Sequence, residues 1–247
     1  MKNPARFLGV VMFLGMTTLA RASDPIGIYA LVDRVVFEPD VALAERIQIW
    51  GAFALATGRG EEYAEPAAGY MYFSLPEKKA EAARKEWADL KKLAGTGKCL
   101  AFAGRYQEKG KVRRSEENAK RPDVYPIAQG VTEMRARTEY PPIKALLSLP
   151  VPLSPADGAD TAAGSVILKV RAVAEKEHKG AKYYFEIEGP AVEKEASPEV
   201  VPSGEEANWS PALKVEPGKK YIWRAWAADG KWKGPVRSAV FQGKAAR

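Results

Sequence analysis

Residues 215–227 read Val-Glu-Pro-Gly-Lys-Lys-Tyr-Ile-Trp-Arg-Ala-Trp-Ala. After the Pro-Gly turn, apolar residues occupy every second position, namely Tyr221, Trp223, Ala225 and Ala227. Successive side chains of a strand point to opposite faces of its sheet, so this alternation predicts a strand with one packed face and one wet face. The same parity places Trp226 on the outer face.

Two upstream segments, 166–172 and 183–188, alternate in the same way. Their predicted inward residues are Val166, Leu168, Val170 and Ala172 in the first segment, and Tyr183, Phe185 and Ile187 in the second. Strands of this kind predict a sandwich of two antiparallel sheets.

The 215–227 stretch resembles the fibronectin type III signature, in which an apolar residue, Pro-Gly and a Tyr lead into the sixth strand. Residues 234–238, Gly-Pro-Val-Arg-Ser, resemble the Gly-Pro-x-x-Ser entry to the last strand of that family. The resemblance covers roughly residues 151–243 and implies a tyrosine corner at Tyr221 and a non-catalytic adhesion or spacer module. The second strand departs from the family, because Val170 stands where a core Trp is usual. Trp223 or Trp209 could fill that volume, and a neighbouring immunoglobulin-like family is the alternative.

The first half is predicted to contain strands at 28–37, 46–55, 69–75, 98–106 and 130–134, with an amphipathic helix over 77–94 between the third and fourth strands. This order resembles an OB-type barrel in topology. A plain α+β sheet with one covering helix is the alternative. A short turn of helix is expected at 143–149.

The expected fold class is therefore mainly β with one or two helices. An N-terminal α+β domain, OB-like in topology, covers 23–148. A proline-rich linker covers 149–155, where the prolines favour an extended linker or a lead-in to an edge strand. The fibronectin-III-like β-sandwich covers 156–243.

Residues 1–22 are predicted to be a cleaved secretory signal peptide. Lys2 and Arg6 precede an apolar run of 14 residues, Phe7–Ala20, and residues 20–22 read Ala-Arg-Ala, a small-x-small cleavage pattern. An uncleaved anchor is the alternative. The mature chain is expected to be exported, periplasmic or extracellular, with no transmembrane segment.

The net charge of +7 falls to +4 without the leader, because 35 basic and 31 acidic residues remain. Both kinds of residue are spread over the two halves of the chain. This weak and even bias argues against nucleic acid as a partner.

The chain has one Cys and one His, which excludes an intramolecular disulfide and a His-rich metal site. Cys99 lies in an apolar run and is predicted to be a buried thiol, while His178 lies in a charged stretch and is predicted to be a solvated turn residue. Residues 95–98, Gly-Thr-Gly-Lys, are better explained as a helix C-cap than as a phosphate loop. No catalytic motif, cofactor site or metal site is predicted.

Aromatic and basic side chains are the best candidates for binding. Trp226 and Trp232 are candidates for an exposed indole pair that stacks on a ligand, with packing at the domain interface or on the surface as alternatives. Tyr70 and Tyr72 could stack beside the basic stretch containing Arg113 and Arg114, which an OB-type barrel would place in the loop before its last strand.

These features predict an exported non-enzymatic binding or scaffolding protein of the cell envelope or exterior, with a protein or carbohydrate of the envelope as partner. A hydrolase or enzyme-accessory protein with its chemistry in the N-terminal domain is the alternative. A third hypothesis is a factor that binds another exported protein through an open sheet edge.

Overall fold

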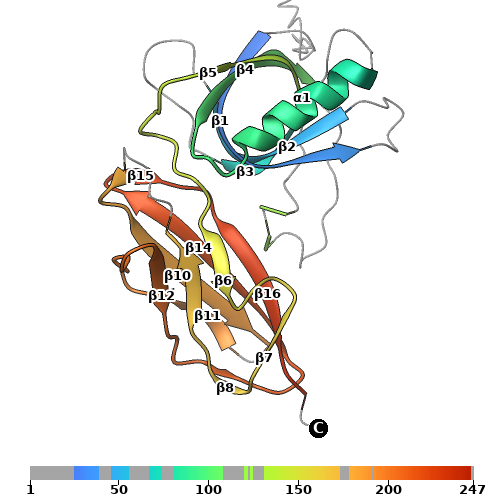
Figure 1. Ribbon diagram of the computed structural model, residues 1–247. Coiled ribbons are helices and arrows are strands. Elements are labelled where there is room, and N and C mark those ends of the chain that lie inside the picture. The colour runs from blue at the N-terminus through green and yellow to red at the C-terminus, as the bar shows by residue number, and fades with distance from the viewer. Residues whose placement is uncertain are drawn as a thin grey trace, which may run out of the picture.

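A computed structural model describes residues 25–38, 46–55, 67–73, 80–107, 120–121, 123–124, 131–172, 178–190 and 192–245. The fold is mainly β with a single helix in this part of the chain. Figure 1 shows the N-terminal strands curled into a barrel and the C-terminal strands in an elongated unit below it.

The N-terminal elements are β1 (Pro25–Glu38), β2 (Arg46–Leu55), β3 (Ala67–Phe73), α1 (Ala80–Leu93), β4 (Cys99–Gln107) and β5 (Val131–Glu139). The strands close into a barrel in the order β1-β2-β3-β5-β4, with β3 and β5 parallel and the other pairs antiparallel. A closed five-stranded sheet with the helix between its third and fourth strands is the topology expected from the sequence, and the plain sheet of the alternative is not formed.

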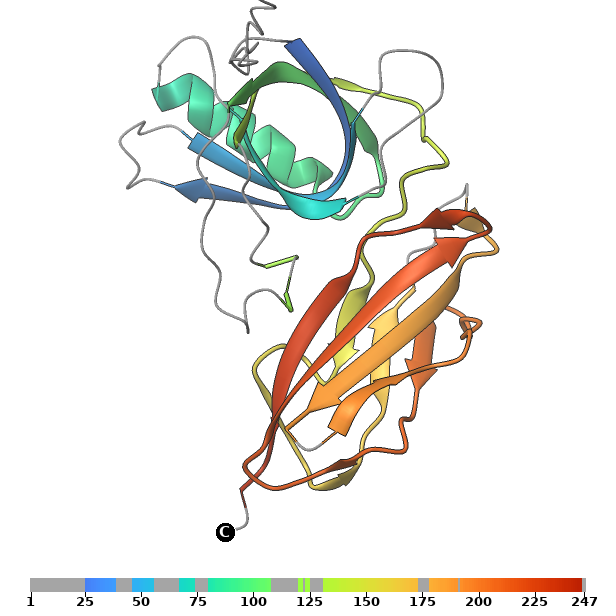
Figure 2. The ribbon, with the colours of Figure 1, turned by 180° about the vertical axis from the view of Figure 1, so that it is seen from behind.

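The barrel core is filled by alternate side chains of β1, β2 and β4 and by residues of α1. Figure 2 shows from behind that α1 lies across the barrel. Leu90 of α1 is fully buried in this core, while Trp87 and Leu93 pack at its edge. The helix therefore has the apolar face that its three- and four-residue spacing predicted.

Two packed sheets form the C-terminal domain. The larger one has the order β11 (Val192–Ala196), β10 (Lys182–Gly189), β14 (Lys220–Asp229), β16 (Arg237–Gly243) and β7 (Ala159–Thr161), with β15 (Trp232–Lys233) paired to β14. The smaller one has the order β12 (Glu206–Trp209), β9 (Leu168–Arg171) and β6 (Val151–Ser154), and a separate short pair joins β13 (Lys214–Val215) to β8 (Gly164–Ser165).

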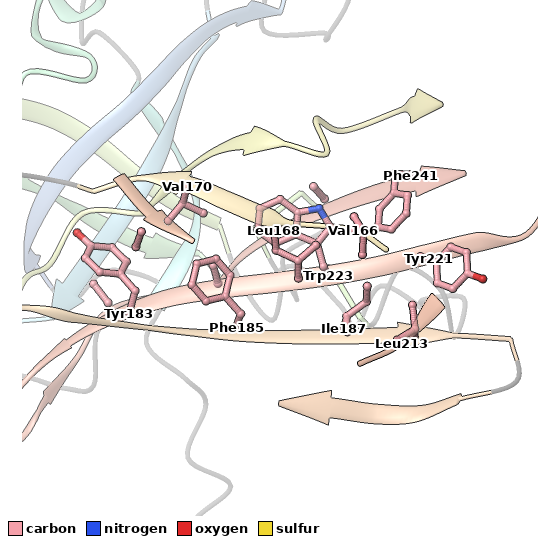
Figure 3. Packing of buried hydrophobic residues seen from close by; sticks show 14 of the residues in the cluster. Val166, Leu168, Val170, Tyr183, Phe185, Ile187, Leu213, Tyr221, Trp223 and Phe241 are labelled. Atoms are coloured by element: carbon pink, nitrogen blue, oxygen red, sulfur yellow. The ribbon is translucent and has the colours of Figure 1, made fainter. Parts of the chain in front are cut away.

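The predicted inward faces of this sandwich are confirmed. Figure 3 shows the rings of Tyr183, Phe185 and Trp223 packed between the sheets. Trp223 is fully buried, and its Nε1 donates a hydrogen bond to the carbonyl oxygen of Pro155 at 3.1 Å. The core therefore takes its indole from β14, as the alternation in 221–227 implied.

Of the two readings of the proline-rich stretch, an extended linker or a lead-in to an edge strand, residues 151–154 take the second. They form β6, an edge strand that accepts Pro152 because an edge strand tolerates a missing N–H donor. Residues 143–149 do not continue as helix: a single turn, closed by the Leu146 N–H bonded to the Ile143 carbonyl at 3.0 Å, is followed by extended chain.

Candidate functional site

The connector between the domains, residues 143–149, packs against both of them. Ile143, Leu146 and Leu149 lie against the outer face of the barrel, in a cluster with Leu31. Leu147 instead belongs to the buried core of the sandwich. Because neighbouring side chains of one short segment are buried in different domains, the connector holds the two domains together rather than spacing them apart.

A second junction is made by residues 120–121 and 123–124, from the chain between β4 and β5. Asp123 is only 4% exposed. Its Oδ2 accepts the backbone N–H of Ser238 at 3.0 Å, and its Oδ1 accepts the Ser238 hydroxyl. Arg121 donates from Nε to the Ser238 Oγ at 3.2 Å and from Nη2 to Asp157 Oδ1 at 2.9 Å. This segment therefore binds the start of β16 and the chain beside it.

Arg237 joins the barrel wall to the same junction. Its Nη2 lies 2.8 Å from Asp33 Oδ2 and its Nη1 lies 3.9 Å from Asp123 Oδ2. The register of β1 against β2 shifts between Val32 and Arg34, so Asp33 is the extra residue of a bulge. The bulge presents Asp33 to the sandwich. We call the contacts of Arg121, Asp123, Asp33, Arg237 and Ser238 the latch.

The latch extends onto the outer face of the larger sheet. Lys120 forms an ion pair with Glu188, and its carbonyl oxygen accepts Arg224 Nε at 3.0 Å. Arg224 Nη2 also reaches Glu188 at 3.4 Å. The hydrogen bond from Lys120 is the main reason that the pKa of Glu188 is below its ordinary value. Partial burial acts in the opposite direction, and the charge of Lys120 and the hydrogen bond and charge of Arg224 lower the pKa further.

A cleft of about 650 Å³ lies between the barrel and the sandwich, next to the latch and the connector. The barrel contributes the loop after α1 and Tyr140 to its walls, and the sandwich contributes Val151, Arg171 and Glu205. Aliphatic side chains of the connector line its floor. Tyr140 and Val151 remain 38% and 39% exposed, which makes them two of the most exposed large apolar side chains in the described residues. The cleft therefore combines an apolar interior with a polar rim.

The loop after α1 is a helix C-cap, as predicted. Gly95 and Gly97 have φ values of 70° and 69°, which favour glycine, and Thr96 Oγ1 donates to the Leu93 carbonyl at 2.6 Å. The Gly95 N–H bonds to the Val32 carbonyl of β1 at 2.8 Å. The loop is therefore fixed to the barrel and gives the cleft a rigid wall.

The charges on the rim are mostly paired. Lys98 Nζ lies 3.2 Å from Glu139, and Asp33 is paired with Arg237. Within the described residues, Arg171 and Glu205 have no ion-pair partner. They are nevertheless close in the fold, because Arg171 pairs in register with Glu206. The cleft thus presents one unpaired cation and one unpaired anion, both on its sandwich wall.

His178 also lines the cleft, and the prediction that it is solvated is wrong. It is 4% exposed, and its Nδ1 lies 2.9 Å from Asp229 Oδ2. Pairing of β10 with β14 brings these two residues together. Cys99, by contrast, is a buried thiol outside any disulfide, as predicted.

The predicted exposed indole pair is not formed. Trp226 is partly buried on the outer sheet face, where it stacks on Tyr184 with ring centroids 5.7 Å apart. Lys233 Nζ lies over the Trp226 ring, 4.7 Å from its centroid. Trp232 packs against the sandwich core instead, with Lys231 Nζ at 4.6 Å. Neither indole takes part in the contacts between the domains described above.

The remaining predicted residues are placed only in part. Tyr70 and Tyr72 lie on β3, opposite Trp50 and Gln48 of β2. Arg113 and Arg114 lie outside the described residues. Tyr140, Arg171 and Glu205 were missed by sequence reasoning, and the one signal near any of them was the proline-rich chain around 141–155, which marks a domain boundary, where ligand sites are common.

No protein-family model matches the sequence, and no curated protein matches it. In the part of the chain that the structure describes, no helix is long and apolar enough to cross a membrane. Among those same residues, no group of three or more His, Cys, Asp or Glu side chains could hold a metal ion.

Proposed function

We propose that this chain is an exported, non-enzymatic binding protein of the cell envelope or exterior, and that the cleft between its two domains is the binding site. The observation that carries the proposal is a cleft of about 650 Å³ with an aliphatic floor and a polar rim, because clefts of this size at domain interfaces are where proteins bind small molecules. The assignment to an exported compartment rests on the leader pattern of residues 1–22.

The scaffolding part of the proposal rests on the latch and the connector. Buried contacts along the floor of the cleft and beside it hold its walls in one arrangement, and a preformed site loses less conformational freedom when it binds. We assign the second domain a fibronectin-III-like role as a rigid wall. Its two-sheet order and the hydrogen bond from the Glu216 N–H to the Tyr221 hydroxyl, at 2.8 Å, support this assignment.

A neutral apolar dye tests whether the cleft binds. N-phenyl-1-naphthylamine fluoresces strongly when it leaves water, and we expect it to bind the mature chain, residues 23–247, at about one molecule per chain. A double variant, Tyr140→Ser with Val151→Ser, removes roughly 60 Å² of apolar contact at about 25 cal/mol per Å², which weakens binding about tenfold.

A matched double variant controls for non-specific binding of the dye to exposed apolar side chains. Ile167 and Val201 are 54% and 70% exposed and lie outside the cleft lining, so Ile167→Ser with Val201→Ser should leave dye binding unchanged. Equal losses in both double variants, or no saturable dye binding at all, would show that the cleft is not the binding site.

A further inference from the structure

We infer that the cleft recognises a small zwitterion with an apolar body, of the class of the apolar and aromatic α-amino acids. This inference rests on the proposed function and names the ligand class of the same site. It starts from the two unpaired charges on the sandwich wall, Arg171 and Glu205.

These two charges are the only ones on the described rim that lack a protein partner, since Lys98 is paired with Glu139 and Asp33 with Arg237. An arginine guanidinium binds a carboxylate through two parallel hydrogen bonds. A glutamate carboxylate accepts hydrogen bonds from an ammonium group. Arg171 and Glu205 together therefore fit a ligand that carries a carboxylate for the arginine and an ammonium group for the glutamate.

Backbone contacts place Arg171 and Glu205 at neighbouring positions of the fold. The Ala172 N–H donates to the Glu205 carbonyl oxygen at 2.7 Å, and Arg171 lies opposite Glu206 in the ladder between β9 and β12. Both side chains thus extend from neighbouring points of one wall. This arrangement suits a head group whose ammonium and carboxylate sit on the same carbon atom better than a longer molecule with charges at opposite ends.

The rest of the cleft fits an apolar body attached to that head group. Tyr140 stands on the opposite wall, its ring held by Tyr29 with centroids 4.7 Å apart. Ile143, Leu146 and Leu149 form the floor between the walls. A ligand bound by its head to the sandwich would therefore rest its side chain on the floor and against a ring supplied by the barrel, so both domains are needed for recognition.

Three probes with the same phenylethyl body test this inference. Phenylalanine carries both charges, 3-phenylpropionate lacks the ammonium group, and 2-phenylethylamine lacks the carboxylate. We expect phenylalanine to displace N-phenyl-1-naphthylamine from the mature chain at a concentration at least about tenfold lower than either analogue needs.

Substitutions then test which group of the ligand each charged side chain binds. Arg171→Ala should weaken phenylalanine about tenfold, to the level of 2-phenylethylamine, and leave 2-phenylethylamine unchanged. Glu205→Ala should remove the advantage of phenylalanine over 3-phenylpropionate. Arg84→Ala and Glu81→Ala, at exposed positions of α1 outside the cleft lining, are matched controls and should change nothing.

The outcomes separate the two proposals. Saturable dye binding with equal displacement by all three probes, or with displacement best by one singly charged probe, overturns the zwitterion inference and leaves the binding site standing. Failure of the dye to bind overturns the proposed function itself.

Discussion

The hydroxyl of Tyr221 gives the sharpest test of how the sandwich is stabilised. Tyr221→Phe removes one oxygen atom and keeps the ring, which is 3% exposed and stacked on Phe241 with centroids 5.2 Å apart. Gly189 leaves room for the ring, because a Cβ at that position would lie 2.6 Å from it. The substitution therefore isolates the hydrogen bonds from the packing.

The expected cost follows from the partners of the hydroxyl. It accepts the Glu216 N–H at 2.8 Å, whereas its own donation to the Lys214 carbonyl, at 3.5 Å, is too long to contribute much. A backbone N–H that loses its acceptor in a half-buried position costs about 1–2 kcal/mol. We expect the free energy of unfolding of the sandwich to fall by about 1.5 kcal/mol.

Equilibrium unfolding in urea, followed by tryptophan fluorescence, measures this change, because four of the six tryptophans belong to the sandwich. With an m-value of about 1.5 kcal/mol per molar, the midpoint should move down by about 1 M. Tyr184→Phe is the control, since the Tyr184 hydroxyl bonds to exposed Glu199 at 3.3 Å and should contribute less than about 0.5 kcal/mol. If the two variants lost the same stability, the tyrosine corner would not stabilise the fold as argued.

Three further predictions concern the barrel, the latch and export. Gly51→Ala places a Cβ 2.1 Å from the Leu31 carbonyl oxygen and should cost the barrel about 3 kcal/mol or more in thermal unfolding followed by circular dichroism, whereas Gly180→Ala, with no atom nearer than 3.9 Å, should cost little. The pKa of Glu188 is lowered in the folded state, so its contacts stabilise the protein above the ordinary carboxyl range and are lost as the pH falls through the lowered pKa. Glu188→Gln should therefore be less stable than the wild type in urea at pH 7, and the difference should vanish at strongly acidic pH; a constant difference would contradict the assignment. N-terminal sequencing of the exported protein should begin at Ser23, and a mature chain that keeps Met1 would refute signal cleavage.

Local patterns predicted the sandwich core because each strand has to bury one face whatever it pairs with. Tyr183, Phe185 and Ile187 are buried for that reason alone. The same parity rule placed Trp226 on the outer face but could not place Trp232. A turn at Gly230 separates the two indoles, and the orientation of the second depends on its pairing with Asp229, which no count along one strand reveals.

Sequence reasoning failed most where burial depends on contacts distant in the chain. The charged neighbours of His178 indicated a solvated turn, yet Asp229, supplied by another strand, lies within hydrogen-bonding distance of its ring inside the protein. Asp123 and Ser238 are likewise 115 residues apart. Neither position carries a local pattern that distinguishes a buried polar group from an exposed one, so the latch and the cleft beside it could not be predicted.

The chemistry of the latch favours orientation over stability. Moving the Asp123 carboxylate out of water is costly, and its hydrogen bonds to Ser238 and the nearby Arg237 charge offset that cost without a large surplus. A docking that kept this carboxylate buried without its partners, or that exposed the connector side chains to water, would cost several kcal/mol. The latch therefore discriminates among arrangements more than it strengthens the preferred one. A cleft whose two walls belong to different domains needs that discrimination, because its shape is defined only when a single arrangement is populated.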